Sequence, residues 1–243
     1  MITVVIPTLD EALRLEPLLA ALAREPAPHE VIVADGGSAD ATRAVAEAAG
    51  AAVVVTPPGR GRQLRAGAAR ARGDVLLFLH ADTRFPPGGL AAVERALVER
   101  PHCPGGNFRL LFDGEDDFSR WLEGFYAFIR ARGFYYGDSA LFVRRRVYDA
   151  LGGIRPLALM EDYDFVRRLE AAGETCSIGE PPLVTSSRRF HGRRPAAIVI
   201  GWIVIHVLHY LGVDDEVLAK LYDSARRRQR VQDPEPLSPQ SYS

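Results

Sequence analysis

The chain has 243 residues and a formal net charge of −1 at pH 7, so its charge gives no electrostatic preference for nucleic acid, and we expect no nucleic-acid partner. The length allows one large domain whose buried core needs no disulfides. The two cysteines, Cys103 and Cys176, have neither metal-site spacing nor a catalytic partner pattern. We therefore expect ordinary buried thiols in a reduced, cytoplasmic setting.

Short apolar runs alternate with helical segments over the first 85 residues. The five apolar residues Val75–Leu79 are too few for a helix and do not alternate, so they predict a strand buried on both faces. The other strands are predicted at Thr3–Pro7, Glu30–Ala34 and Ala51–Thr56. This order is typical of a parallel sheet with crossover helices. The chain start lacks the basic and long apolar regions of a signal peptide, so we expect none.

The helices of this half are predicted from their apolar positions and from the turns that precede them. The first follows Thr8–Glu11 and should bury its leucines, which are Leu13, Leu18, Leu19 and Leu22. Ser38 or Asp40 is the expected N-cap of the helix that runs to Ala49. The segment from Gly59 opens a third helix that runs to about Arg72.

The second half is expected to mix strands and helices without an internal repeat. Helices are predicted at Pro86–Glu99, Phe118–Arg130 and Glu161–Ala172. Strands are predicted at Gly106–Phe112, Ala140–Val143, Thr175–Ile178 and Leu183–Ser186. The resulting fold class is an α/β protein with a mixed, mainly parallel sheet flanked by helices.

The C-terminal part reads as a helical extension over residues 193–230, followed by a disordered tail over 231–243, which is rich in Pro, Ser and Gln. Residues 196–212 carry no charge, but the run is shorter than a membrane-spanning helix needs. We expect a helix buried in the protein. The alternatives are a helix on a membrane surface, which would place the protein at the inner face of the membrane, or a homodimer contact through 196–230.

Polar residues gather where the predicted strands end. His80 and Asp82 lie two positions apart, so in extended backbone their side chains leave on the same side and can converge on one ion or phosphate. Alternatively, Asp82 only caps a turn. The further polar residues expected at this edge are Asp10, Glu11, Asp35, Arg62, Asp138, Glu161 and Asp162. So many carboxylates repel one another unless they bind a cation or a ligand's donors, and a nucleoside diphosphate with Mg²⁺ or Mn²⁺ supplies both.

Four separated motifs resemble family-2 glycosyltransferases of the GT-A fold, over roughly residues 1 to 190. They are Val4–Glu11, Val31–Thr42, His80–Asp82 and Glu161–Asp162. Additional matches at Gly59–Leu64, Phe78–Thr83, Tyr136–Asp138 and Met160–Asp164 resemble a short bacterial branch labelled arsenosugar-biosynthesis or radical-SAM/selenodomain-associated glycosyltransferases. The resemblance implies a nucleotide-binding half at about 1–85 and an acceptor half at about 86–192.

The resemblance also implies a role for each matching residue. Asp35 would accept a hydrogen bond from the nucleotide base, Asp82 would bind Mn²⁺ or Mg²⁺, and Asp162 would be the general base. The full nucleotide-binding set is Pro7, Thr8, Leu9, Glu11, Asp35, Arg62 and Ala81. His80 replaces the first aspartate of the usual Asp-x-Asp pattern, and imidazole is a better ligand for Mn²⁺ than for Mg²⁺.

The activity implied is an inverting transfer of a sugar from a nucleotide-diphospho-sugar to the hydroxyl of an acceptor, either a small molecule or a lipid-linked one. His191 is expected as an additional metal ligand, and the acceptor or phosphate contacts are Asp138, Glu161, Arg188, Arg189 and Tyr136. Several of the site residues have a structural alternative: Asp162 and Glu161 as helix N-terminal carboxylates, Asp35 as a turn residue, and Arg188 and Arg189 as part of a solvated basic linker. The competing function is a non-catalytic nucleotide-sugar-binding or scaffold protein.

Overall fold

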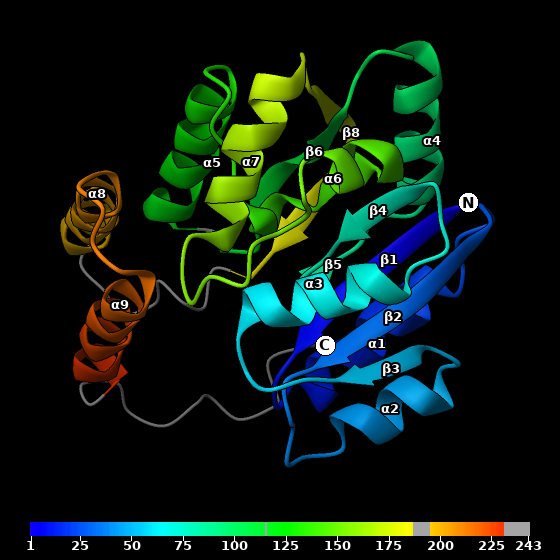
Figure 1. The fold of residues 1–243 in the computed structure, drawn as a ribbon, viewed down its shortest axis with the longest axis horizontal. Helices are drawn as coiled ribbons and strands as arrows, with labels where there is room; N and C mark the ends of the chain where they lie inside the picture. Colours follow the sequence, from blue (N-terminus) through cyan, green and yellow to red (C-terminus); the bar gives the residue numbers. More distant parts are fainter. Residues whose placement is uncertain (115, 187–194, 231–243) are drawn as a thin grey trace. The chain divides into compact units, whose positions relative to one another are not determined.

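The computed structural model describes residues 1–114, 116–186 and 195–230. The chain divides into two compact units, Met1–Ser187 and Arg188–Ser243. The first unit holds an eight-stranded sheet flanked by helices, and the second holds two helices (Figure 1). The predicted fold class, an α/β protein with a mixed sheet and C-terminal helices, is therefore confirmed.

The sheet has the strand order β3-β2-β1-β4-β7-β6-β8-β5. Its strands are β1 Ile2–Thr8, β2 His29–Asp35, β3 Ala52–Val55, β4 Val75–Phe78, β5 Thr83–Arg84, β6 Gly105–Phe112, β7 Leu141–Arg144 and β8 Cys176–Thr185. The first four in this order are all parallel, whereas β7 runs antiparallel to both β4 and β6. Because β1, β2 and β4 are parallel, their carboxyl ends meet at one edge, where ligands bind in such sheets.

Helices cover both faces of this sheet. The helices of the first unit are α1 Ala12–Leu22, α2 Thr42–Ala48, α3 Arg60–Arg70, α4 Gly89–Glu99, α5 Asp117–Arg130, α6 Arg145–Ala150 and α7 Glu161–Ala172, with a 3₁₀ turn at Gly137–Ser139. Along the chain, β1, β2 and β3 follow one another toward one side of the sheet, and β4 then lies on the other side of β1. Because the crossovers are right-handed, this change of direction places α3 on the face opposite α1 and α2. In Figure 1, α3 lies across β1 and β2 in this way.

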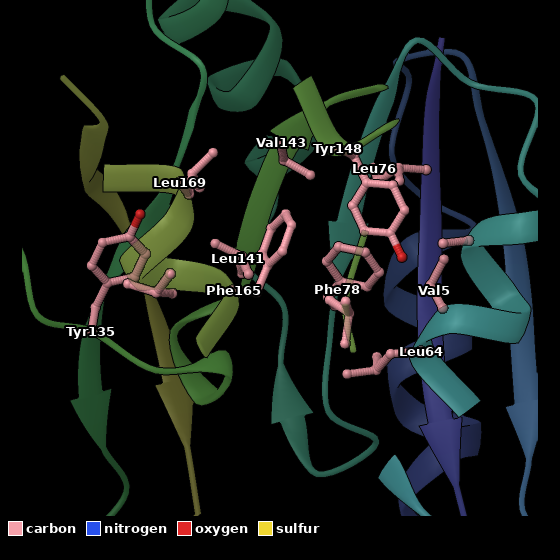
Figure 2. Packing of buried hydrophobic residues seen from close by; sticks show 13 residues of the cluster. Val5, Leu64, Leu76, Phe78, Tyr135, Leu141, Val143, Tyr148, Phe165 and Leu169 are labelled. Atoms are coloured by element: carbon pink, nitrogen blue, oxygen red, sulfur yellow. The ribbon is translucent and has the colours of Figure 1, made fainter. Parts of the chain in front are cut away.

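A buried cluster joins the sheet to α3, α6 and α7 (Figure 2). The sheet contributes Val5, Leu76, Phe78, Leu141 and Val143, and the helices contribute Leu64, Tyr148, Phe165 and Leu169. The tilted rings of Tyr148 and Phe165 lie 5.4 Å apart between their centroids. The strands from both halves of the chain therefore share one core, which fixes α3 and α7 relative to each other.

Several element predictions need correction. The two strands expected at Thr175–Ile178 and Leu183–Ser186 form one strand, β8, because its pairing with β6 continues past an irregularity near Arg109. Leu13 is 89% exposed and Leu15 is buried in its place, since the inward stripe of α1 is Leu15, Leu18, Leu19 and Leu22. The short elements β5 and α6 were not predicted.

The expected N-cap of the second helix is also wrong. Ala41 stands at that position, and no side chain caps it. Asp40 still accepts from the backbone N–H of Thr42, the first residue of α2, through Oδ1 over 2.9 Å, and its Oδ2 accepts from the N–H of Ala12, at the start of α1, over 3.1 Å. Asp40 therefore accepts hydrogen bonds from the first backbone N–H groups of both α1 and α2.

In the second unit, α8 Pro195–Tyr210 and α9 Asp215–Arg230 contact each other. The uncharged run predicted as one helix corresponds to α8. In the part of the chain that the structure describes, no helix combines the length and apolar character needed to cross a bilayer.

A buried glutamate before β2 caps a helix that lies far along the chain. Glu25 Oε1 accepts from the backbone N–H of Gly88 over 2.7 Å, and Oε2 accepts from that of Leu90 over 2.9 Å. These N–H groups begin α4 and have no partner within the helix. Glu25→Ala should lower the free energy of unfolding by about 2 kcal/mol, since it removes two charge-assisted hydrogen bonds and leaves donors unsatisfied.

Urea denaturation checks this loss. The control is Glu47→Ala, at an exposed position of α2, where a change within about 0.5 kcal/mol is expected. Equal stability of the two variants would contradict the capping role.

Candidate active site

An arginine at the start of α3 joins two carboxylates at the start of α7. Arg60 Nε donates to Glu161 Oε1, and Arg60 Nη2 lies 3.1 Å from Asp162 Oδ2. Glu161 and Asp162 are 1% and 6% exposed, whereas 37% of the Arg60 side chain is exposed. Two adjacent buried carboxylates need a cation beside them. The ion pair thus links the first half of the domain to the second.

Local backbone features bring these charges together. A Cβ added at Gly61 would lie 2.7 Å from the carbonyl oxygen of Arg155 and 2.9 Å from that of Leu157, so only glycine allows α3 to approach this loop so closely. Met160, the residue before α7, has a φ of 66°, in the left-handed region, and the chain turns there into the helix. Glu161 and Asp162 follow as the first residues of the helix, where the helix dipole favours negative charge.

Backbone donors also hold Asp162. Its Oδ2 accepts from the N–H of Gly137 over 2.9 Å, and its Oδ1 accepts from the N–H of Tyr163 over 2.8 Å. Burial raises the pKa of Asp162, but the charge of Arg60 and these N–H groups outweigh burial and hold the pKa below its usual range. Asp162 is therefore ionised at neutral pH. For Glu161, burial outweighs Arg60 and raises the pKa.

His80 lies beside this carboxylate. A Cβ added at Gly137 would lie 3.1 Å from Asp162 Oδ2 and 3.6 Å from His80 Nε2, so both side chains border the same point. Burial lowers the pKa of His80, and the nearby charge of Arg60 lowers it further. The imidazole is therefore neutral at pH 7 and keeps a lone pair for a metal ion or a proton.

The carboxylates of Asp82 and Asp138 complete the polar cluster, since the charges of both act on His80. Asp138 is buried, and its Oδ2 accepts from the hydroxyl of Tyr126 over 3.0 Å. Tyr136 packs between Tyr126 and Tyr163, with ring centroids 6.3 and 6.0 Å away. The structure therefore brings together five of the predicted site residues, His80, Asp82, Asp138, Glu161 and Asp162.

A neutral imidazole and a carboxylate form a donor set that suits Mn²⁺. Among the residues that the structure describes, no three His, Cys, Asp or Glu side chains are grouped so that they could hold a metal. An ion bound by His80 and Asp82 would take its other ligands from a diphosphate and water, as ions that bridge nucleotide phosphates do. His191, Arg188 and Arg189 lie outside the described residues.

The loops after β1 and β2 are hydrogen-bonded to each other. The backbone N–H of Asp10 donates to Ser38 Oγ over 2.9 Å, and Asp10 Oδ1 accepts from the N–H of Ala39 over 2.8 Å. The N–H of Glu11 donates to Thr42 Oγ1 over 2.9 Å. These bonds shape the predicted base and ribose loop before any ligand arrives.

Asp35 is fully buried at the end of β2. Its Oδ2 accepts from the N–H groups of Gly37 and Ser38 over 3.0 and 2.9 Å, and its Oδ1 accepts from the hydroxyls of Ser38 and Thr8. A carboxylate offers about four acceptor positions, and these donors use all of them. The predicted contact with a nucleotide base stays a prediction and requires one of these bonds to open.

Two residues of the site were not singled out in the sequence, although both lie in the Gly59–Leu64 motif. Gln63 is buried and its Nε2 donates to the carbonyl oxygens of Thr8 and Ala34, which ties the ends of β1 and β2 together. Arg60 pairs with the buried carboxylates, whereas Arg62, the predicted nucleotide ligand, is exposed. Of the other predicted nucleotide-binding residues, Thr8 and Ala81 are buried, Pro7 and Glu11 are half-buried, and Leu9 is exposed.

The comparisons with known proteins agree with this architecture. The family model described as Glycosyl transferase family 2 matches residues 3–149. Glucosyl-3-phosphoglycerate synthase from Mycobacterium tuberculosis, solved with Mn²⁺, uridine diphosphate and phosphoglyceric acid, is 19% identical, with a TM-score of 0.62 over 88% of this chain and 80% of that one. A comparison with proteins of curated function gave no match.

S. aureus TarS has a similar fold. Its 1–349 fragment is 16% identical, with a TM-score of 0.61, and the match covers 85% of this chain. The chain spans 65% of that fragment and 39% of a longer TarS chain.

The sheet order, its helices and the polar edge at the ends of β1, β2 and β4 define the class as an α/β domain of the glycosyltransferase A type. Within that class the chain belongs to glycosyl transferase family 2, since the family match covers more than half of its length.

Replacement of Arg60 tests the electrostatic account of the site. Arg60→Met leaves two buried carboxylates without their cation and should lower the free energy of unfolding by about 2 to 4 kcal/mol at pH 7. Burial then raises the pKa of both carboxylates, so the variant recovers stability relative to wild type as the pH falls. Denaturant curves at pH 7 and pH 5 should show a smaller deficit at pH 5.

The matched control is Arg62→Met, two residues away and exposed, which should change stability by less than about 0.5 kcal/mol at either pH. A deficit for Arg60→Met that is the same at both pH values would contradict this account.

Proposed function

We propose that the protein is a metal-dependent, inverting glycosyltransferase that moves a sugar from a nucleotide-diphospho-sugar to the hydroxyl of an acceptor. One observation carries the proposal: in a family-2 domain, His80 and Asp82 lie at the carboxyl edge of the parallel strands beside a buried, ionised Asp162. This edge offers metal ligands and a proton acceptor within one polar cluster.

The structural relatives support the choice of donor and ion. Solved complexes of the mycobacterial synthase contain Mn²⁺ with uridine diphosphate or uridine-diphosphate-glucose. We infer a similar donor class here, with His80 and Asp82 holding the ion. A bound Mn²⁺ or Mg²⁺ would stabilise the negative charge that develops on the departing diphosphate. The narrower assignment to the arsenosugar-biosynthesis or radical-SAM-associated branch remains part of this proposal and rests on the motifs alone.

In this mechanism Asp162 takes the proton of the acceptor hydroxyl as its oxygen attacks the anomeric carbon. The lowered pKa keeps Asp162 ionised but makes it a weak base. Proton transfer therefore occurs late, when attack has made the hydroxyl acidic and the bond to the diphosphate is breaking. A single displacement inverts the anomeric centre, and no enzyme nucleophile takes part.

The competing function, a non-catalytic nucleotide-sugar-binding or scaffold protein, is favoured by one specific observation. Asp35 and Asp162 both receive hydrogen bonds from the chain's own backbone. Such carboxylates can be purely structural, and the two functions differ in what replacing Asp162 does to turnover.

The experiment measures nucleoside diphosphate release from UDP-, GDP- and dTDP-sugars in the presence of Mn²⁺, with water taking the place of the acceptor hydroxyl. Asp162→Asn should lower the rate with the preferred donor at least about 100-fold, since it removes the general base. Donor binding, followed as a shift of the unfolding temperature, should be retained.

The control is Asp149→Asn, an exposed position on α6, which should leave the rate unchanged. Equal rates for wild type and Asp162→Asn would contradict the catalytic role. If the wild type binds a sugar nucleotide but turns none over, with water or with phosphorylated hydroxyl compounds supplied as acceptors, the result favours the scaffold function.

A further inference from the structure

A groove of about 660 Å³ lies between α5 and the sheet strands β6 and β8. Its volume is in the range of small-molecule sites. Asn107 and Arg109 of β6 and Ser177 of β8 form its floor, and one face of α5 forms its wall. Asn107 pairs with Ser177 in the strand register, so the floor is continuous sheet. No function described so far uses this groove.

Two glycines keep the groove open. A Cβ added at Gly124 of α5, or at Gly179 of β8, would meet no atom within 4 Å. Ala127 and Ala131 follow Gly124 along the same face of α5 and are also small. A side chain added at Gly124 would therefore start in the open space of the groove.

The lining carries more positive than negative charge. Three arginines, Arg109, Arg120 and Arg130, line the groove against one carboxylate, Glu123. Glu123 Oε1 accepts from the backbone N–H of Phe112 over 3.2 Å. The excess of arginine favours an anionic ligand, and the planar guanidinium group matches the oxygens of a phosphate.

The arginines differ in how firmly the protein holds them. Arg130 donates to Asn107 Oδ1 and to Thr175 Oγ1, and its side chain is 18% exposed. Arg109 and Arg120 are 54% and 66% exposed and pair with exposed carboxylates on the surface. Such surface pairs are weak, so Arg109 and Arg120 can turn toward a ligand.

One end of the groove adjoins the candidate active site. Tyr126 and Ser139 line the groove here, and the hydroxyl of Tyr126 donates to Asp138 Oδ2 over 3.0 Å. The turn Gly137–Ser139 borders both spaces, since the N–H of Gly137 donates to Asp162 and Ser139 lines the groove. A molecule held in the groove therefore lies next to the turn that positions the proposed base.

We propose that this groove anchors the acceptor, which is a small molecule carrying a phosphate group that Arg109 and Arg120 bind. This inference rests on the proposed function, because it assigns the second substrate of the same reaction. The acceptor class is thus a phosphorylated hydroxyl compound. Arg109 and Arg120 bind its phosphate, whereas His80 and Asp82 act on the donor.

The test measures binding of inorganic phosphate by thermal unfolding, at constant ionic strength kept with chloride. Wild type should be stabilised in a saturable way. Arg109→Gln combined with Arg120→Gln should weaken phosphate binding at least about tenfold, since each arginine supplies a charge-assisted hydrogen bond. Gly124→Leu, which fills the groove, should abolish the effect.

The charge-matched control is Arg24→Gln combined with Arg70→Gln, two exposed positions outside the groove, and it should bind phosphate as wild type does. In a separate titration, UDP with Mn²⁺ should stabilise all variants, which shows that they are folded and that the donor site is intact. Phosphate stabilisation that survives Gly124→Leu or the double arginine variant, or that is absent in wild type, overturns the groove assignment. If UDP with Mn²⁺ fails to stabilise wild type, the proposed function fails, and the acceptor role falls with it even where phosphate binds.

Discussion

The site depends above all on the ion pair of Arg60 with Glu161 and Asp162, because it joins elements from both halves of the domain. Arg60 begins α3, which packs on β1 and β2, and the carboxylates begin α7, in the second half of the chain. The same guanidinium that holds these helices together lowers the pKa of Asp162 and of His80. The charge of Arg60 therefore both stabilises the contact between α3 and α7 and sets the ionisation of the candidate catalytic groups.

Preorganisation is the second constraint. The loops after β1 and β2 are held by hydrogen bonds from Asp10 to Ser38 and from Glu11 to Thr42, and Gln63 ties the ends of β1 and β2 together. Loops fixed in this way lose little further entropy when a ligand binds. Asp35 is also held by the chain's own donors, the N–H groups of Gly37 and Ser38. It must therefore lose one of its internal hydrogen bonds before it can accept one from a nucleotide. The site is thus built from rigid loops around one polar cluster.

Much of the fold could be predicted because the buried parallel strands are short apolar runs, as in Val75–Leu79, at regular intervals. The order of the motifs also predicted that His80, Asp82 and Asp162 would lie together. The pairing of Arg60 could not be predicted, since Arg60 and Arg62 both lie at the start of one helix and only the packing of α3 against Arg155–Leu157 decides which of them faces α7. The role of Arg62 as a nucleotide ligand stays a prediction. Glu25 and the groove beside Gly124 were missed for the same reason: they depend on contacts between segments distant in sequence.

The most direct test of the central claim, that His80 and Asp82 hold the ion that binds the donor, is pulsed electron paramagnetic resonance of Mn²⁺ with UDP bound to the protein. The account predicts an imidazole nitrogen coupling to Mn²⁺ in wild type, which is lost in His80→Asp while Mn²⁺ stays bound. A UDP complex in which wild-type Mn²⁺ shows no such coupling, or the same coupling in His80→Asp, would contradict it.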